Sequence, residues 1–428
     1  MTLFRISDAL SVSFMVDSLS IFFMILITFI FGLVIFYAID YMKPDRCGKR
    51  FFVFFLLTYV MLMLLAVSAN AVTMYMCFEF MAMFSTPLVL HDNTPTSRAA
   101  SIKYLGYSTL GAALALFGFF IVWSCGASLD FVRGGNPIPE GCEAKMQAAY
   151  FLIFIGFGCK AGLVPFQLWL TEAHPVAPAP AHTVLSGVVT KVGVLGIIRA
   201  TFFMFGADFI RGSWMQEVLL VMVLVTIFFG SMLALKEHVI KKRLAYSTIS
   251  QVSYVLFGIL LLNTTAFEGA LLHIVFHALA KGALFLSVGS VIFRTDVHSV
   301  EEFFAIGKRM PITMGCFALG SLSLVGIPPF GGFTSKWYLA MGALQDNPAV
   351  GVIGTVVLLV SALLTAFYLF PVATKAFFPG KDYVPGENCE ITHLMMIPLV
   401  SFAVLSLVLG IFPNGLCSVF SAIAESLM

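Results

Sequence analysis

Long apolar stretches recur along the whole of this 428-residue sequence. Twelve of them are long enough to cross the roughly 30 Å hydrocarbon core of a bilayer, which takes about 20 residues of helix. They lie near residues 19–40, 51–68, 71–90, 102–124, 148–170, 181–205, 214–235, 243–262, 266–293, 311–344, 349–375 and 392–412. The sequence is 60% hydrophobic and 11% charged, so a soluble fold could not bury its apolar surface. We therefore predict an all-α polytopic membrane protein, which excludes a cytoplasmic enzyme, a nucleic-acid binder, a disordered chain and a disulfide scaffold.

Two of these stretches contain the same helix-breaking pattern, Gly-x-x-Pro-Phe. It occupies residues 162–166 in the fifth stretch and residues 326–330 in the tenth, which Pro328 and Pro329 interrupt. Proline removes a backbone hydrogen bond, and a membrane tolerates the freed carbonyl only beside protein or a polar cavity. Each break falls in the fourth member of a run of five stretches. Because five is odd, two such copies would cross the membrane in opposite directions, as inverted transporter repeats do.

This pattern divides the chain into four expected parts. An N-terminal helix and cytoplasmic loop (1–50) precede the first inverted repeat (51–205). The second inverted repeat (214–375) is followed by a C-terminal helix and tail (376–428). The first apolar stretch is too long for a cleavable signal peptide, so none is expected.

Lysine and arginine are distributed unequally between the two sets of loops, and cytoplasmic loops normally carry the excess. One set contains 15 of them: Lys43, Arg46, Lys49, Arg50, Arg98, Lys103, Lys236, Lys241, Lys242, Arg243, Arg294, Lys308, Arg309, Lys375 and Lys381. The other set contains 4: Arg5, Arg133, Lys145 and Arg211. The first set is therefore predicted to face the cytoplasm, with both termini outside the inner (cytoplasmic) membrane.

The cysteines indicate neither a metal site nor a redox motif. All eight occur singly, without a Cys-x-x-Cys pair. Cys125 and Cys142 flank one loop and could pair, although free thiols are the favoured interpretation. The sequence also lacks a glycine-rich nucleotide loop, a flavin fingerprint and a set of cluster-ligating cysteines. We therefore expect no metal, no cofactor and no redox chemistry of its own.

Five basic residues fall inside the apolar stretches: Lys160, Lys191, Arg199, Lys281 and Lys336. A charge at the bilayer centre costs about 2.5–3.5 kcal/mol on insertion scales, so such residues mark functional sites by default. Arg199 lies near the end of its stretch, where snorkelling to the interface is the simpler interpretation. The four lysines are candidates for proton carriers.

Glu79 lies in a wholly apolar setting and is the candidate partner of a buried lysine. Opposite charges 4 Å apart interact by about 4 kcal/mol at an effective dielectric of 20. Movement of Glu79 toward or away from Lys160 would therefore load or unload a proton. The alternatives are a Glu79 that is protonated or bonded to another subunit, and a Lys160 bonded only to carbonyls freed at the helix break.

His273, His277 and Lys281 are spaced four residues apart and therefore share one helix face. Histidine changes its charge near neutral pH and has two exchangeable ring nitrogens, which suits a central proton wire. Core histidines bonded to carbonyls and haem ligands are the alternatives. Spacing of four residues on one helix does not suit a bis-histidine haem, which needs facing helices.

Three further residues extend this candidate route. Lys191 is predicted to be the next relay station, and Lys336 the terminal station that exchanges protons with the outer aqueous phase. Packing or snorkelling lysines are the alternatives. His182 is equally well interpreted as a relay residue or an interface histidine. Asp17, at the end of a stretch, is expected to be a helix cap.

Several motifs resemble those of one known family. They are Val-Asp-Ser-Leu-Ser at 16–20, Cys-Phe-Glu-Phe at 77–80, Lys-Ala-Gly-Leu-Val-Pro-Phe-Gln-Leu-Trp-Leu at 160–170, Glu-Ala-His at 172–174, Ala-Pro-Ala-Pro at 177–180, Lys-Val-Gly at 191–193, and the segments 273–281 and 326–336. Over residues 14–412 the chain resembles the antiporter-like proton-pumping membrane subunits shared by respiratory complex I, Mrp cation/proton antiporters and energy-converting hydrogenases of the formate-hydrogenlyase type.

The resemblance implies a pump pair of Glu79 and Lys160, with Lys191, His277, Lys281 and Lys336 as the onward route. It also implies partners in a multisubunit membrane complex, and no nucleic acid. Two departures stand out: two helices that usually precede the Asp-Ser-Leu-Ser motif are expected to be missing, and the stretch around His182 is more similar to the hydrogenase branch.

The expected function is a proton-translocating subunit of a redox-driven complex, of NADH:quinone or hydrogenase type. The first alternative is an Mrp-type Na⁺/H⁺ antiporter subunit, with Na⁺ as a coupling ion. Two further interpretations are a haem-bearing membrane cytochrome that uses His273 and His277, and a structural arm with idle lysines.

Overall fold

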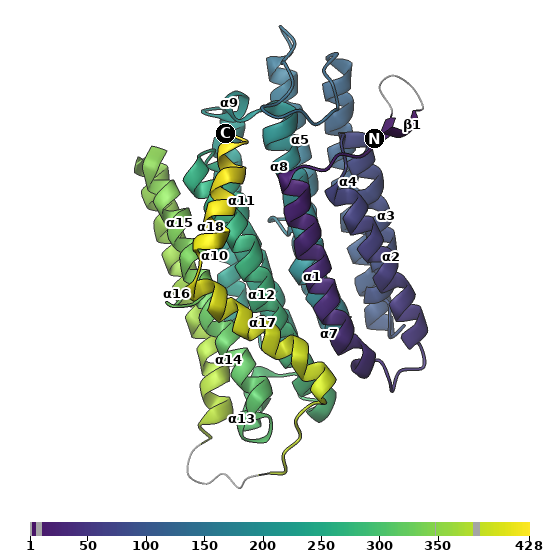
Figure 1. Ribbon diagram of the computed structural model, residues 1–428, viewed down its shortest axis with the longest axis vertical. Coiled ribbons are helices and arrows are strands. Elements are labelled where there is room, and N and C mark those ends of the chain that lie inside the picture. The colour runs from purple at the N-terminus through teal and green to yellow at the C-terminus, as the bar shows by residue number, and fades with distance from the viewer. Residues whose placement is uncertain (1, 6–10, 347, 380–385) are drawn as a thin grey trace.

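The computed structural model describes residues 2–5, 11–346, 348–379 and 386–428, and it is an elongated bundle of long helices (Figure 1). Lys381, one of the basic loop residues, lies outside the described residues. Two short strands, β1 (Thr2–Arg5) and β2 (Ser11–Ser13), pair in antiparallel fashion near the start of the chain. The all-α membrane fold predicted from the apolar stretches is therefore confirmed.

The twelve predicted stretches each coincide with a helix or with a series of helix segments. The first part of the chain contains α1 (Ser18–Tyr41), α2 (Gly48–Ala66), α3 (Ala71–Val89), α4 (Pro95–Ser124), α5 (Glu143–Ala161), α6 (Leu168–Val176), α7 (Ala179–Val184), η1 (Leu185–Val189), α8 (Thr190–Ile198) and η2 (Arg199–Phe205). The remainder contains α9 (Ala207–Ile210), α10 (Trp214–Lys236), α11 (Ile240–Leu260), α12 (Thr264–Thr295), η3 (Val300–Phe303), α13 (Ile306–Arg309), α14 (Pro311–Val325), α15 (Gly331–Asp346), α16 (Pro348–Phe377), α17 (His393–Ile411) and α18 (Asn414–Glu425). The sequence did not predict α18.

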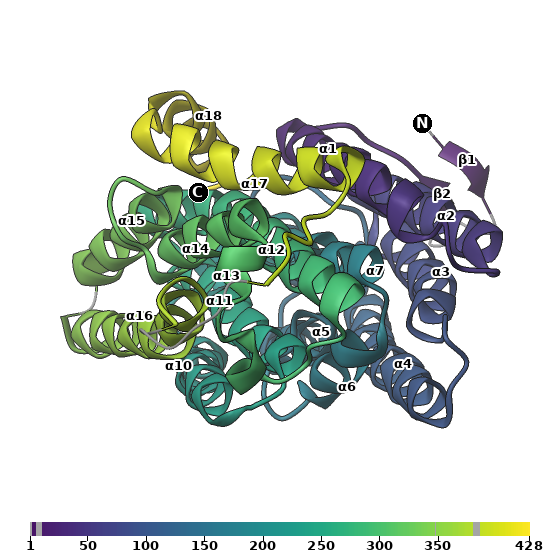
Figure 2. The same cartoon turned by 90° about the horizontal axis from the view of Figure 1, so that it is seen from below.

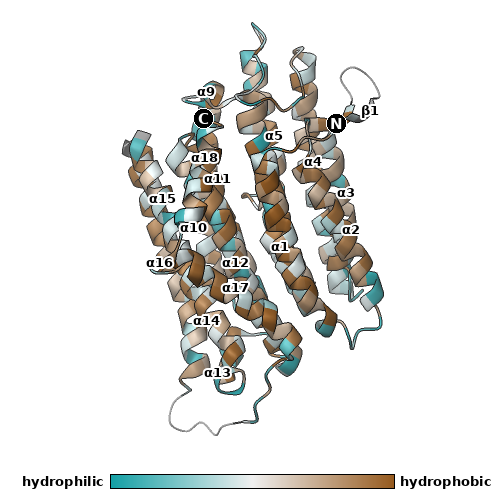
Figure 3. Ribbon diagram, viewed as in Figure 1, coloured by the Kyte–Doolittle hydropathy of each residue, from teal (hydrophilic) through white to brown (hydrophobic). Residues whose placement is uncertain are grey.

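Nine continuous helical segments in the described part of the chain are long and apolar enough to cross a membrane, so this is a multi-pass membrane protein. The other three predicted stretches are the broken pairs α5–α6 and α14–α15, and α11, whose first turn contains Lys241, Lys242 and Arg243. Hydrophobic residues cover the long helices, and hydrophilic residues gather at several helix ends and loops (Figure 3). This pattern is what a bilayer requires of helices that face lipid.

Both predicted helix breaks are present. Gly162 ends α5 with φ of 90°, and Gly326 ends α14 with φ of 89°, a left-handed conformation that glycine adopts without a steric penalty. The amide of Leu163 donates to the carbonyl of Gly158, and the amide of Ile327 donates to that of Leu322. Each break thus leaves several carbonyls at the end of a helix inside the bundle. The inverted relation of the two halves stays a prediction.

The centre of the bundle is formed by α12 and by the continuous segment α7–η1–α8–η2, whose spanning windows are 94% and 100% buried. In the end view α12 lies among α11, α14 and α17, and α1 and α17 lie at the rim (Figure 2). Helices at the rim present apolar side chains outward, such as Leu359 and Phe117. A polar side chain escapes lipid only where helices pack against one another, and the central helices provide the largest share of such buried positions.

One end of the bundle, here called the basic end, contains residues 42–47, 90–94, 237–239, 296–310 and 386–392. Contacts between loops gather these segments: Asp45 pairs with His91 at 2.5 Å, and the carbonyl of Arg309 accepts from the amide of Cys389. The marked N and C ends of the chain lie toward the opposite end (Figure 1). The alternation of loops that the charges predicted is thus present.

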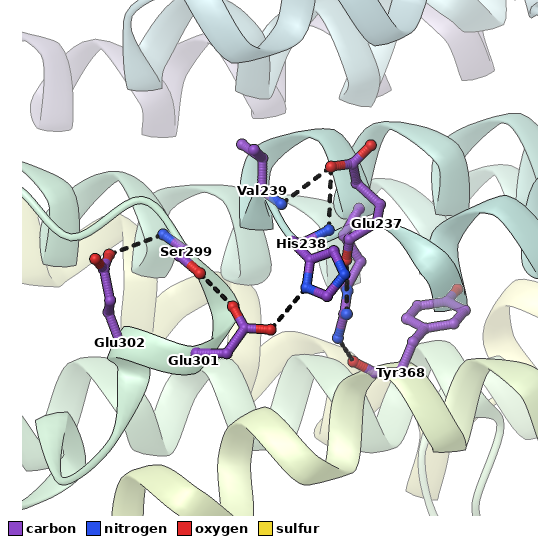
Figure 4. Close-up of polar contacts among 8 residues, drawn as sticks. Glu237, His238, Val239, Ser299, Glu301, Glu302 and Tyr368 are labelled. Atoms are coloured by element: carbon purple, nitrogen blue, oxygen red, sulfur yellow. Dashed lines mark hydrogen bonds and ion pairs between the residues drawn. The ribbon is translucent and has the colours of Figure 1, made fainter.

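A cluster of polar contacts lies at the basic end, beside α11 (Figure 4). His238 Nδ1 lies 2.7 Å from a Glu301 carboxylate oxygen, and Val239 forms an isolated bridge with Ser299. A hydrogen bond from Ser299, together with His238 and the backbone, lowers the pKa of Glu301 to about 2. Glu301 therefore remains a carboxylate at neutral pH and holds the α10–α11 loop against η3.

Arg199 does not snorkel, and that prediction is wrong. Its side chain is 1% exposed, and its guanidinium binds the carboxylate of Asp17 at 2.6 and 3.0 Å. It also donates to Ser20 Oγ at 2.9 Å. Asp17 is in addition the N-cap of α1, as predicted, because it accepts from the amide of Ser20. A two-pronged ion pair between residues 182 positions apart thus joins α1 to η2.

We expect Arg199→Met to lower the free energy of unfolding by about 3–5 kcal/mol, because it leaves the carboxylate of Asp17 buried without a partner. The measurement is thermal unfolding of the purified chain in detergent. Asp17→Asn combined with Arg199→Met should recover most of the loss, and Arg133→Met, at an exposed position, should have little effect. An Arg199→Met protein as stable as wild type would contradict this assignment.

Candidate functional site

Lys160 lies in the last turn of α5, directly before the first break, and is 1% exposed. Its ammonium donates to the hydroxyl of Tyr104 at 2.7 Å and to Ser108 Oγ at 2.9 Å, both on α4. It also lies 4.0 Å from the centre of the Tyr104 ring and 5.2 Å from that of Trp169. Neutral oxygens and ring faces therefore stabilise this buried charge, and the alternative of carbonyl partners alone does not hold.

Glu79 lies on α3, half-buried, with Oε1 buried and without a hydrogen-bond partner among the described residues. Its charge interacts with that of Lys160. Within the part of the chain that the structure describes, however, no salt bridge joins the two. Met76 and Phe80, next to Glu79 on α3, are exposed, so Glu79 approaches Lys160 from the outer side of the bundle. The two members of the predicted pair are therefore not in direct contact.

Lys191 and His277, 86 residues apart in sequence, meet in the middle of the bundle. The Lys191 ammonium lies 2.7 Å from His277 Nδ1 and also donates to the carbonyl of Ser186. Both side chains are 1% exposed. Lys191 follows η1, a π-helical turn, and such turns often occur at functional sites. The sequence placed both residues in the candidate route, and the structure brings them into contact.

His273 and Lys281 extend this cluster along α12 in both directions. His273 Nδ1 lies 2.9 Å from Ser335 Oγ, and its ring stacks on Tyr254. Its ring centre is 6.1 Å from that of His277, which confirms the shared helix face. Lys281 donates to the carbonyl of Leu244 at 2.8 Å and to Ser247 Oγ. Because both histidines lie on one face of one helix, they do not face each other across a haem.

Lys336 lies on α15 and binds the end of the helix that precedes it. Its ammonium donates to the carbonyls of Leu324 and Val325 at 2.7 and 2.9 Å, in the last turn of α14. These carbonyls are freed by the second break and carry the negative end of the helix dipole. The ammonium also lies 5.2 Å from the centre of the Tyr254 ring, which stacks on His273. Tyr254 thus connects Lys336 to the histidines.

Buried polar residues that the sequence analysis missed complete the site. Gln251 follows Ser247 by one turn of α11, and both its amide atoms are buried without a partner among the described residues. His174, fully buried on α6, has no partner there for either ring nitrogen. Buried polar atoms normally have a hydrogen-bond partner. For Gln251 the only signal was its spacing of one turn from Ser247, which is common in helices, and His174 belongs to the Glu-Ala-His motif at 172–174, to which no role was given.

The route is not a single chain of contacts. Among the described residues, no hydrogen bond or ion pair joins Lys160 to Lys191. Their helices nevertheless pack closely: a Cβ at Gly193 would collide with the carbonyl oxygen of Phe157 and lie 3.2 Å from Lys160 Cβ. The candidate site therefore has two parts, one around Lys160 and one from Lys191 to Lys336.

The structure contains no group of three or more His, Cys, Asp or Glu side chains arranged to hold a metal ion, as far as the described residues extend. Cys125 and Cys142, at the two ends of one loop, are free thiols. The expectation that they stay unpaired remains a prediction. The chemistry that this arrangement offers is proton transfer between buried bases.

These features define a multi-pass membrane protein with a buried row of ionisable groups. Residues 68–365 match the family described as NADH:quinone oxidoreductase/Mrp antiporter, TM, and residues 4–52 match NADH-Ubiquinone oxidoreductase (complex I), chain 5 N-terminus. The first match covers more than half of the chain, so the protein belongs to the NADH:quinone oxidoreductase/Mrp antiporter family.

Known relatives come from three kinds of complex. NADH-quinone oxidoreductase subunit N of Desulforudis audaxviator is 32% identical over 95% of this chain and 83% of its own length. Hydrogenase-4 component B of Escherichia coli is 29% identical over 96% of this chain, which spans only 64% of that relative. A Na(+)/H(+) antiporter subunit of Bacillus subtilis is 25% identical over 83% of this chain and 71% of its own length.

Two solved complexes contain chains of the same fold. A chain of the membrane-bound sulfane sulfur reductase, an archaeal respiratory membrane complex, has a TM-score of 0.87 and 22% identity over 100% of this chain and 85% of its own. A chain of the Mrp complex from Dietzia sp. has a TM-score of 0.83 and 20% identity over 98% of this chain and 85% of its own. At these identities the similarity shows the fold alone.

We expect Gly193→Ala to destabilise the chain by about 1–3 kcal/mol, because the added methyl group would force α8 away from the backbone of α5. Gly187→Ala is the matched control on the same helical segment, since a Cβ there meets only Ile30, at 3.6 Å. Thermal unfolding in detergent measures both. Equal stability of the two variants would show that the α5–α8 contact does not need glycine.

Proposed function

We propose that this chain carries protons across the membrane as a subunit of a redox-driven complex, most like the energy-converting hydrogenase or complex I type. The observation that carries the proposal is the contact between the Lys191 ammonium and the His277 ring, deep in the bundle. A neutral imidazole nitrogen accepts a hydrogen bond from an ammonium, and the proton can then pass along it. A purely structural lysine needs no such partner.

The proposed cycle begins at Glu79 and Lys160. A redox reaction in a partner subunit shifts charge along the membrane arm and moves Glu79 relative to Lys160. Contact would hold the proton on the amine, since two opposite charges at 4 Å interact by about 4 kcal/mol at an effective dielectric of 20. Separation releases the proton toward Lys191. From there it passes through the His277/Lys281 region and His273 to Lys336, with bound water bridging the gap after Lys160.

The proposal includes an orientation and an internal symmetry. The basic end faces the cytoplasm, because cytoplasmic loops carry the excess of lysine and arginine, and both termini lie outside the inner membrane. Residues 51–205 and 214–375 are two inverted repeats. In support, each half contains one broken helix in the same order, ended by a left-handed glycine. Residues 1–50 and 376–428 flank the repeats.

The proposed partners are other membrane subunits of a multisubunit complex, because the named relatives are components of such complexes. The second candidate function is an Mrp-type antiporter subunit that exchanges Na⁺ for protons, and the Bacillus subtilis relative favours it. The two differ in their driving force. Acidification or alkalinisation of vesicles that depends on Na⁺ without redox substrate would support the antiporter.

Two variants in the assembled complex test the proposal. We expect Lys160→Ala and Glu79→Gln each to reduce proton translocation about tenfold or more, because each removes one member of the pair that holds the proton. Fluorescent pH probes in membrane vesicles measure the rate, with oxidation of the electron donor followed in parallel. Lys308→Ala, an exposed lysine of the basic end, is the control and should translocate normally. Wild-type translocation by both variants would refute the proposal.

A further inference from the structure

Two fully buried histidines, His174 on α6 and His182 on α7, lie beside the central cluster. Their ring centres are 6.2 Å apart. The proposed cycle does not assign a step to either of them. They lie on the short helices that follow the first break, on the side of Lys281 that points toward the basic end.

His182 has a carbonyl acceptor beside each of its two ring nitrogens. Its Nδ1 lies 3.3 Å from the carbonyl oxygen of His174, and its Nε2 lies 3.5 Å from that of Phe285. A neutral imidazole has one N–H and can satisfy only one of these two acceptors. A protonated ring has two and satisfies both. These two acceptors offset part of the cost of charging the buried His182 ring, which has no carboxylate partner and is opposed by the charge of Lys241.

His174 differs in that its two ring nitrogens have no partner among the described residues, although the side chain is fully buried. One nitrogen of a neutral ring donates and the other accepts, so the ring can take a proton on one side and release it on the other. Three lysines on neighbouring helices act electrostatically on the His174 ring: Lys281 on α12, Lys191 on α8 and Lys241 on α11.

Phe285 separates the two histidines from Lys281. Its fully buried ring stacks on His174 with ring centres 5.4 Å apart, and its centre lies 4.5 Å from that of His182. The Lys281 ammonium lies 5.4 Å from the same ring centre. One apolar side chain therefore lies against the groups on both sides, and its ring offers no hydrogen-bond donor or acceptor that could relay a proton.

Polar groups connect the histidines to the basic end. Lys241, in the first turn of α11, donates to the carbonyls of Pro175 and Ala177, both at 3.3 Å. Its charge acts on both His174 and His182. It also interacts with Asp92, an exposed carboxylate in the α3–α4 loop. Lys241 and Asp92 thus provide polar groups on the basic-end side of the buried pair.

We propose that His174 and His182 form a proton-loading station that is filled from the basic end and emptied to Lys281 when the Phe285 ring turns aside. The inference rests on the proposed function and adds to it the intake route and its gate. A proton from water near Asp92 reaches His182, passes to His174, and moves to the neutral amine of Lys281. Lys281 must have given up its own proton first.

The gate is tested without any redox partner. The full chain, with whatever subunits copurify, is placed in liposomes, and the collapse of an imposed pH gradient is followed. Phe285→Ala should collapse the gradient several-fold faster than wild type, and His174→Gln added to Phe285→Ala should abolish the excess. Phe267→Ala, a buried phenylalanine on the same helix away from the cluster, is the matched control. Phe285→Leu, which keeps more volume, should leak less than Phe285→Ala.

The station is tested in the assembled complex. His174→Gln and His182→Gln should each lower proton translocation several-fold and change its dependence on the pH at the basic end, which a merely structural role would not do. His298→Gln, an exposed histidine of that end, is the control.

Two results would overturn this inference: an excess leak in Phe285→Ala that His174→Gln does not reduce, or a wild-type pH profile in the His174→Gln and His182→Gln complexes. Loss of translocation in Lys160→Ala alongside such results would leave the proposed function standing. Normal translocation in both Lys160→Ala and Glu79→Gln would instead refute the proposed function itself.

Discussion

An ammonium ion inside a membrane protein needs an oxygen, a ring face or a base within reach, and this requirement organises the structure. The four intramembrane lysines meet it in different ways. Lys160 uses hydroxyls and aromatic rings, and Lys191 uses an imidazole. Lys281 uses a carbonyl and a serine hydroxyl, and Lys336 uses the carbonyls freed by a broken helix. Each of these ways of stabilising an ammonium group requires that a second helix lies nearby. The central helices are therefore almost completely buried, and glycines let their backbones approach.

The same requirement limits how many protons the central cluster can hold. The charges of Lys191, Lys281 and His277 act on one another without a carboxylate in contact. Like charges at short range oppose one another strongly in a medium of low dielectric. A proton that arrives at one member therefore favours the departure of another. In the proposed cycle, directional transfer then depends on the gate at Phe285 and on the proposed movement of Glu79.

The sequence predicted the features that depend on composition and local pattern. The twelve apolar stretches, both breaks at Gly162 and Gly326, and the shared face of His273 and His277 follow from helix length, proline chemistry and helical period. What depends on contacts between distant segments could not be predicted. The Arg199–Asp17 pair, the hydroxyls around Lys160 and the place of His174 are examples, because serine, tyrosine and histidine in apolar helices are too common to indicate a partner. The distance between Glu79 and Lys160 is set by tertiary packing alone.

The most direct test of the account is whether Lys191 and His277 share a proton in a lipid bilayer. Solid-state nitrogen NMR of the full chain with labelled histidine reports the state of each ring nitrogen, and His277→Gln identifies the resonance. The account predicts that Lys191→Met shifts the His277 Nδ1 resonance and leaves that of His238, at the surface of the basic end, unchanged. A His277 resonance that is the same with and without the Lys191 amine would contradict it.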